Sequence, residues 1–599
     1  MDVSFAYDAL PKGSIRLIKV HNSDIFPPGD GIIDCSLQKF PLSESPPYTA
    51  LSYVWGTDNP TRELRLNGKA ILVRDNLHAF LCHIKPTPDD CLSVSDQKQY
   101  SPSYDEECRV RSMPTKDVPT AEVGYLWVDA LCIDQGNNDE KMHQVAGMGR
   151  IYSRASRIVC WLGENCKDII TDLLLEYGVE SDEKKPVHWR SNHSEYTPFF
   201  SHRYWRRAWI VQEASTANVP RQMWWGTKRL SWETVVLANR RLGLAWLSKV
   251  YLDFLLRPRP HAVERFDDLS TRRRNNSNSS SSSSASSFAG VLLDLLFKYS
   301  DMGATDHRDN VYALLPIAED ITSTISPLIP DYSIPVGQVY FHAARLILQD
   351  RTLSSRFDIL LLRRLKPGGS ADGLGGWVPD WANGRAGRLY TMTEVEYKAG
   401  GCWDLPFVHL VGEDGRLTLQ CVEIDEINNT PPHFPFDDNT DAEDARIWKK
   451  FARFLLPNPE AKTYVNGEPL ATAISRFLTW GTYDNDTPPI PLIDVAQGNR
   501  ILSESEQESC IQYNTGVGQF LPTFRTKMGY WGTLEEEAHR LEDCDKVVVV
   551  LGVKAPLVLR RTSPNDDSEW KIVGPCYVEG VMNGEMLKGD YKTTGLVIR

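Results

Sequence analysis

Short apolar segments separated by turn residues begin the chain, and this pattern predicts an α/β fold. Residues 14–20 and 48–55 have the length and apolar content of strands. The second of these runs is followed by Gly56, which can form a tight turn. We therefore expect the N-terminal part to be built on a sheet.

A hairpin and a helix are predicted next. Residues 62–73 alternate around the dipeptide Asn67-Gly68, and both of these residues tolerate the positive φ that a two-residue hairpin loop needs. Asp75 or Asn76 is placed to cap the helix that follows. The next stretch, 86–122, is polar and aperiodic, which predicts a surface insertion.

Three consecutive segments predict a parallel βαβ unit. Residues 125–133 form a nearly continuous apolar run, typical of a strand buried in a parallel sheet, and residues 158–162 form another. Between them, 139–155 has helical periodicity. Its predicted apolar face consists of Met142, Val145, Met148, Ile151, Tyr152 and Ala155. The order strand, helix, strand favours a crossover connection, and a further helix is expected over 168–177.

Composition changes sharply at the Ser/Asn run of 272–287, which cannot bury apolar area and predicts a linker. We expect its arginine triplet to be a solvated linker end. Helices are predicted beyond it over 288–299, 308–317 and 336–349, and short strands dominate after residue 401. The predicted organisation is an α/β domain at 1–262, a Ser-rich linker or disordered loop at 263–288, a helical region at 289–400 and a β-rich domain at 401–599.

Charge and cysteine content narrow the function classes. The 599 residues include 66 Lys and Arg against 79 Asp and Glu, a net charge of −13, which argues against a nucleic-acid-coating protein. The 12 cysteines form no CxxC pair, so a disulfide scaffold or zinc ribbon is not expected. The N-terminus lacks the apolar core of a secretory signal, and no run is long enough to span a bilayer. We expect a cytoplasmic protein.

Polar residues gather at the end of the 125–133 segment. Asp129, Asp134 and Gln135 lie where α/β sheets bind ligands, just beyond the carboxyl end of a buried strand. The alternative is structural, with both carboxylates accepting backbone N–H groups at the turn. A metal site from Asp129 and Asp134 lacks an obvious third ligand, and we expect no metal.

A second cluster lies in the segment YWRRAWIVQE, 204–213. If it is helical, Trp209 and Glu213 share a face at i and i+4. A carboxylate beside indoles can have a raised pKa, and Arg207 can hold a phosphate. The alternative is a structural Arg–Glu pair under aromatic cover.

Three blocks of the sequence resemble those of the fungal heterokaryon-incompatibility (HET) domain. They are YTALSYVWG at 48–56, LWVDALCIDQGNNDEKMHQVAGMGRIYSRASRIVCWLGE at 126–164, and YWRRAWIVQE at 204–213. Downstream segments such as WVPDW (377–381) and GPCYVEGVMNGE (574–585) resemble HET proteins of the heterokaryon-incompatibility-6 type. The resemblance implies a role in allorecognition and programmed cell death.

HET domains are considered distant relatives of TIR domains, so the resemblance also implies a flavodoxin-like parallel sheet. Some TIR domains cleave NAD with a glutamate four positions after a Trp, a spacing that Trp209 and Glu213 share. Glu213 is then the candidate catalytic carboxylate, stabilising the ribosyl cation as nicotinamide leaves. Arg207 would hold the pyrophosphate, and Trp205 or Trp209 would stack on a ring. The motifs identify no cofactor with certainty, and NAD is the candidate substrate.

Two functions remain open at this stage. One is a NAD nucleosidase-like hydrolase, and the other is a non-catalytic signalling module that binds a protein partner or itself under control of the C-terminal region. The location of Glu213 separates them. A solvent-accessible cleft shared with Asp129 or Asp134 favours the enzyme, and burial in a closed ion pair favours the signalling module.

Overall fold

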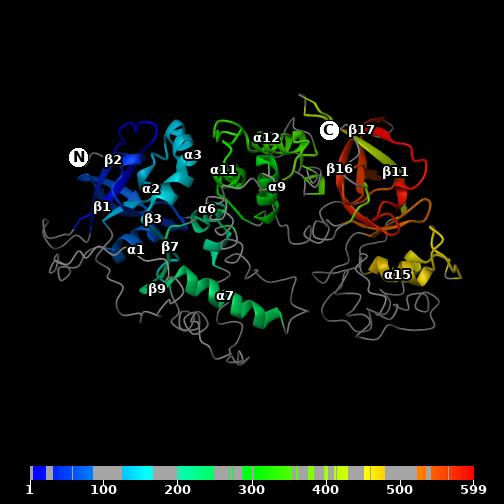
Figure 1. Cartoon of the computed structure of the whole chain (residues 1–599), viewed down its shortest axis with the longest axis horizontal. Helices are drawn as coiled ribbons and strands as arrows, with labels where there is room; N and C mark the ends of the chain where they lie inside the picture. Colours follow the sequence, from blue (N-terminus) through cyan, green and yellow to red (C-terminus); the bar gives the residue numbers. More distant parts are fainter. Residues whose placement is uncertain are drawn as a thin grey trace.

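A computed structural model covers the chain and arranges three parts in sequence order (Figure 1). An α/β unit holds the N-terminus, helices lie in the middle, and a β-rich unit holds the C-terminus. The structure describes residues 5–21, 32–56, 58–84, 124–165, 199, 202–216, 218–247, 269, 273, 287–299, 302–353, 359–361, 376–382, 397–401, 410–412, 415–429, 451–458, 460–478, 523–534, 541–563 and 566–599. The expected insertion at 86–122, the helix at 168–177 and the serine run itself lie outside these residues.

The N-terminal α/β unit is built on a nine-stranded sheet of order β5-β4-β2-β1-β6-β3-β7-β8-β9. Its strands are β1 (Ser14–Val20), β2 (Ile33–Pro41), β3 (Tyr48–Tyr53), β4 (Arg62–Leu66), β5 (Lys69–Val73), β6 (Tyr125–Trp127), β7 (Arg157–Trp161), β8 (Arg221–Trp225) and β9 (Lys228–Ser231). The predicted β4–β5 hairpin is confirmed, with positive φ at Asn67 (53°) and Gly68 (75°).

Four neighbouring strands, β6, β3, β7 and β8, run parallel. If β3, β6, β7 and β8 are numbered 1 to 4 by their order in the chain, their order across the sheet is 2-1-3-4. The predicted crossover is confirmed, because β6 and β7 both pair with β3 and helix α3 (Asn138–Arg154) connects them.

The expectation of one long strand over 125–133 is wrong. Strand β6 ends at Trp127, and Asp129–Cys132 form a single helical turn, α2. Leu131 and Cys132 of this turn are apolar and buried, as residues of a buried strand would be. Periodicity cannot separate these two structures over so few residues.

Helices cover both faces of this sheet. Successive strand residues point to opposite faces, and on β7 the ring of Trp161 contacts Phe80 of α1 (Asp75–Ile84), whereas Cys160 interacts with Tyr204 on the other side. Tyr204 belongs to the short helix η4 (Arg203–Arg206), which precedes α6 (Ile210–Ala214). The unit also contains η2 (Leu42–Glu44) and α7 (Trp232–Leu247).

A helical unit follows, consisting of α9 (Phe288–Lys298), α10 (Asp309–Tyr312), α11 (Leu315–Thr322) and α12 (Val336–Gln349). The helix expected over 308–317 is therefore two short helices, and Pro316 lies in the first turn of the second, where proline is tolerated. The helical unit lies beside α3 and α6 of the α/β unit (Figure 1). Its apolar residues form one continuous core with that unit.

The C-terminal part is β-rich, as predicted. Six strands form a closed ring, because β11 pairs with both β12 and β14 at the ends of the order β11-β12-β13-β16-β15-β14. All ring pairings are antiparallel, and β17 pairs in parallel with β16. The elements are β10 (Leu410–Val411), β11 (Leu417–Asn429), α15 (Leu470–Leu478), β12 (Thr523–Thr526), β13 (Trp531–Leu534), β14 (Lys546–Val550), β15 (Leu557–Ser563), β16 (Asp566–Val578), η6 (Glu585–Leu587) and β17 (Thr594–Ile598).

Candidate functional site

Glu213 lies against the carboxyl end of strand β3. It is carried by α6, and its N–H donates to the Trp209 carbonyl at 3.2 Å, so Trp209 and Glu213 are related as i and i+4 of a helical turn. Its side chain is 1% exposed. The Ser52 hydroxyl, near the end of β3, donates to the Glu213 carboxylate and lies 2.8 Å from the Tyr204 hydroxyl. Glu213 is thus held inside the unit.

Arg207 is the cation of this site. Its Nη1 lies 3.5 Å from Glu213 Oε2, and its side chain is 18% exposed. Asp129, directly after β6, supplies a second negative charge that acts on both of these residues. The Asp129 carboxylate accepts from Trp55 Nε1 at 2.8 Å and from the N–H of Ala130 at 2.7 Å. Three residues predicted from sequence, Glu213, Arg207 and Asp129, therefore lie together.

The site contains two carboxylates and one guanidinium. Burial raises the pKa of Glu213, against the lowering effects of Arg207 and Ser52. Burial also raises the pKa of Asp129, to about 6, although Arg207 opposes the shift. Both shifts have the same physical cause, because a low-dielectric site disfavours a second uncompensated negative charge. In this arrangement Glu213 forms a closed network and presents no surface to a ligand.

The indole N–H groups of the two tryptophans bond outside the Glu213–Arg207 pair. Trp209 Nε1 donates to Asp309 of the helical unit at 3.0 Å, so its indole belongs to the contact between the units. Trp205 is 2% exposed, donates to the Phe199 carbonyl at 2.7 Å, and packs edge-on against the ring of Tyr204. Stacking on a ligand ring remains a prediction for both tryptophans.

Asp134 and Gln135 lie in the turn before α3. The Asp134 carboxylate accepts from the N–H of Gly136 at 3.0 Å, and the exposed Gln135 amide donates to the Asp129 carbonyl at 3.0 Å. The cap of α3 is Asn137, whose side chain accepts from the N–H of Glu140. Asp134 therefore shapes the turn, as the structural alternative proposed.

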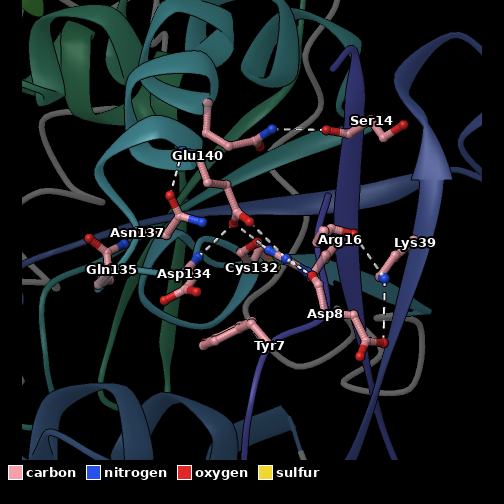
Figure 2. Close-up of polar contacts among 12 residues, drawn as sticks. Tyr7, Asp8, Ser14, Arg16, Lys39, Cys132, Asp134, Gln135, Asn137 and Glu140 are labelled. Atoms are coloured by element: carbon pink, nitrogen blue, oxygen red, sulfur yellow. Dashed lines mark hydrogen bonds and ion pairs between the residues drawn. The ribbon is translucent and has the colours of Figure 1, made fainter. Parts of the chain in front are cut away.

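A buried ion pair fixes this turn against the sheet (Figure 2). Arg16 of β1 is 1% exposed and pairs with both carboxylate oxygens of Glu140, at 2.5 and 2.9 Å. The same guanidinium donates to the carbonyls of Cys132 (3.0 Å) and Asp8 (2.6 Å), and Glu140 accepts from the N–H of Asp134 at 2.8 Å. The arrangement ties β1, α2 and α3 together and so positions Asp129.

Sequence reasoning missed four residues of this region: Ser52, Tyr204, Arg16 and Asp309. A signal was present for Arg16, a charge flanked by Ile15 and Leu17 in a predicted strand, since a buried charge requires a partner. Ser52 likewise interrupts an apolar run. Neither position reveals which residue is the partner.

The described residues include no group of three or more His, Cys, Asp or Glu side chains arranged to hold a metal ion. Across the same part of the chain, every helix is too short or too polar to cross a bilayer.

Comparison with known proteins agrees with the sequence motifs. Residues 112–213 match the Heterokaryon incompatibility protein (HET) family, and residues 499–595 match the Het-6 beta-barrel domain. The chain is 25% identical to "Heterokaryon incompatibility protein 6, OR allele" of Neurospora crassa, over 97% of this chain and 96% of that protein. No solved structure matches the chain.

Proposed function

We propose that this chain, a HET-domain protein that also carries a Het-6 barrel domain, acts in fungal heterokaryon incompatibility as an effector of programmed cell death. Two observations support this role. The chain is similar to an incompatibility protein along almost the whole length of both chains, and it matches both a HET family and a Het-6 barrel domain. The helical unit and the β-rich C-terminal part would then regulate the HET domain.

The geometry supports a non-catalytic mechanism best. The observation that carries it is the burial of Glu213, which is 1% exposed and held by Ser52 and Arg207. A catalytic carboxylate must reach the reacting atoms of its substrate. In the arrangement described here, Glu213 stabilises the α6 segment, and the HET domain would signal by binding a protein partner or a second copy of itself.

Expression of the chain in a fungal host, together with the trigger that makes the wild-type chain cause cell death, tests this proposal. Cell death should persist with Glu213→Gln, which keeps the shape of the side chain and a hydrogen-bond acceptor for Ser52. Asp75→Asn is a matched control, since it removes a carboxylate from an exposed ion pair with Arg62. Death that disappears with Glu213→Gln, while the variant remains folded and the control remains active, would overturn the non-catalytic mechanism.

NAD cleavage is the second candidate, and the parallel sheet favours it. The order 2-1-3-4 of β3, β6, β7 and β8 is the order found in the first four strands of flavodoxin-like sheets, the fold expected of a TIR relative. Glu213, Arg207 and Asp129 gather at the carboxyl edge of these strands, where such sheets bind ligands. This mechanism requires a rearrangement that exposes Glu213, and nicotinamide release that depends on Glu213 would support it.

A further inference from the structure

The segment that carries Glu213, residues 203–216, is held at its start by the helical unit. Gly303 pairs with it as a short parallel bridge: its N–H donates to the Arg206 carbonyl at 2.6 Å, and its carbonyl accepts from the Ala208 N–H at 2.9 Å. These bonds flank Arg207, the partner of Glu213. The backbone around the ion pair is therefore fixed by a residue almost a hundred positions away.

A side-chain contact holds the middle of the segment. The Asp309 carboxylate, on α10, accepts from Trp209 Nε1 at 3.0 Å and from the Tyr332 hydroxyl at 2.6 Å. Asp309 is 8% exposed, and Lys141 of α3 lies 4.1 Å from the centre of the Tyr332 ring. We call Trp209, Asp309 and Tyr332 the latch. Asp309 satisfies donors from both units, so its removal leaves the partly buried Trp209 N–H and the buried Tyr332 hydroxyl without their acceptor.

Arg273 holds the end of the segment. It is 5% exposed and donates to the carbonyl and hydroxyl of Ser215 at 3.2 and 3.1 Å, and it also pairs with Asp320 of α11. The expectation that this arginine is a solvated linker end is wrong, because it bridges two units. Close backbone packing adds to the contact, since a Cβ at Gly149 of α3 would lie 3.0 Å from Pro316 of α11.

We propose that the helical unit is an intramolecular cover that holds the Glu213-bearing segment against the sheet through this latch, and that lifting the cover activates the HET domain. The inference rests on the proposed effector function. Its structural basis is that one short segment is bonded to the helical unit directly at its start and middle, and through Arg273 and Asp320 at its end. A conformational change in the helical unit or in the β-rich C-terminal part could be transmitted to Glu213 through those bonds.

Hydrogen exchange of the full chain tests the latch without any assay of cell death. Asp309→Ala should accelerate exchange of the amides in 206–216 at least tenfold, while amides of β3 and β7 exchange as in the wild type. Asp75→Asn, an exposed carboxylate far from the latch in the chain, should match the wild type throughout. Unchanged exchange over 206–216 would overturn the proposal.

A milder variant covers the case in which Asp309→Ala loosens the whole unit. Tyr332→Phe removes only the hydroxyl that donates to Asp309, so selective acceleration over 206–216 supports the latch and its absence overturns it. The activation step is read separately in the fungal host, where latch variants should cause death without a trigger. If the wild type never causes death, the effector function is refuted. The hydrogen-exchange result tests the latch independently of that outcome.

Discussion

Replacing Arg16 by Met should release α3 and the turn that positions Asp129 from the sheet. Met keeps much of the side-chain length but removes the guanidinium and its four hydrogen bonds. Glu140 would remain 93% buried without its cation, since its side chain is 7% exposed. Breaking a buried pair in this way costs about 3–5 kcal/mol. We expect about 3 kcal/mol, because the Asp134 N–H still donates to Glu140.

The direction of the pH dependence follows from Glu140. Burial would raise its pKa, but hydrogen bonds from Arg16 and Asp134 lower it below the usual value. A lowered pKa contributes stability above the unfolded pKa of about 4.3, and this contribution is lost as the pH falls through the folded pKa. The difference between wild type and Arg16→Met should therefore be larger at pH 7 than at pH 3.

Native-state hydrogen exchange of α3 in the full chain measures this effect, because it reports local opening free energies. A loss of about 3 kcal/mol corresponds to exchange roughly a hundredfold faster. Arg62→Met is the control, since the Arg62–Asp75 pair is more than half exposed and such pairs contribute little. If Arg16→Met exchanges within threefold of this control, the assignment of the Arg16 pair as the anchor of the turn is refuted.

Three further predictions concern single side chains. Ser52→Ala removes a donor to the buried Glu213 carboxylate and should destabilise α6 by about 1–3 kcal/mol, measured by exchange; unaltered α6 protection would count against the network. Burial raises the pKa of Asp309 to about 6, so protonation of Asp309 stabilises the folded protein. This contribution is complete below pH about 4 and is lost as the pH rises through about 6. The unfolding free energy of the wild type relative to Asp309→Asn should thus fall by about 2 kcal/mol from pH 4 to 7 in urea titrations, and a constant difference would contradict this. Asn137→Ala removes the cap of α3 and should lower protection of its first turn by about 1 kcal/mol; full protection would show that the cap is dispensable.

Local patterns predicted the elements whose structure depends on neighbours in sequence. The β4–β5 hairpin follows from Asn67-Gly68, and α3 follows from its 3.6-residue periodicity, with Val145, Met148 and Ile151 buried as expected. The α2 turn was missed because a buried helical turn and a buried strand have the same apolar composition.

The site depends on contacts between distant residues, which periodicity does not contain. Glu213 and Ser52 are 161 positions apart, and Trp209 and Asp309 are 100 positions apart. The sequence motifs placed Glu213, Arg207 and Asp129 in two separate blocks, and only the parallel strand order brings these blocks to one edge of the sheet. Burial of Glu213 likewise follows from the packing of α6 against β3 and α3, and not from its neighbours in sequence.

Nicotinamide release from NAD by the purified full chain tests the central claim most directly. The wild type and Glu213→Gln should be compared at high protein concentration, both free and under forced oligomerisation. Because Glu213 is enclosed by Ser52 and Arg207, we expect no release from the wild type above that from Glu213→Gln in either state. Release by the wild type that Glu213→Gln abolishes would contradict the non-catalytic account and establish Glu213 as a catalytic residue.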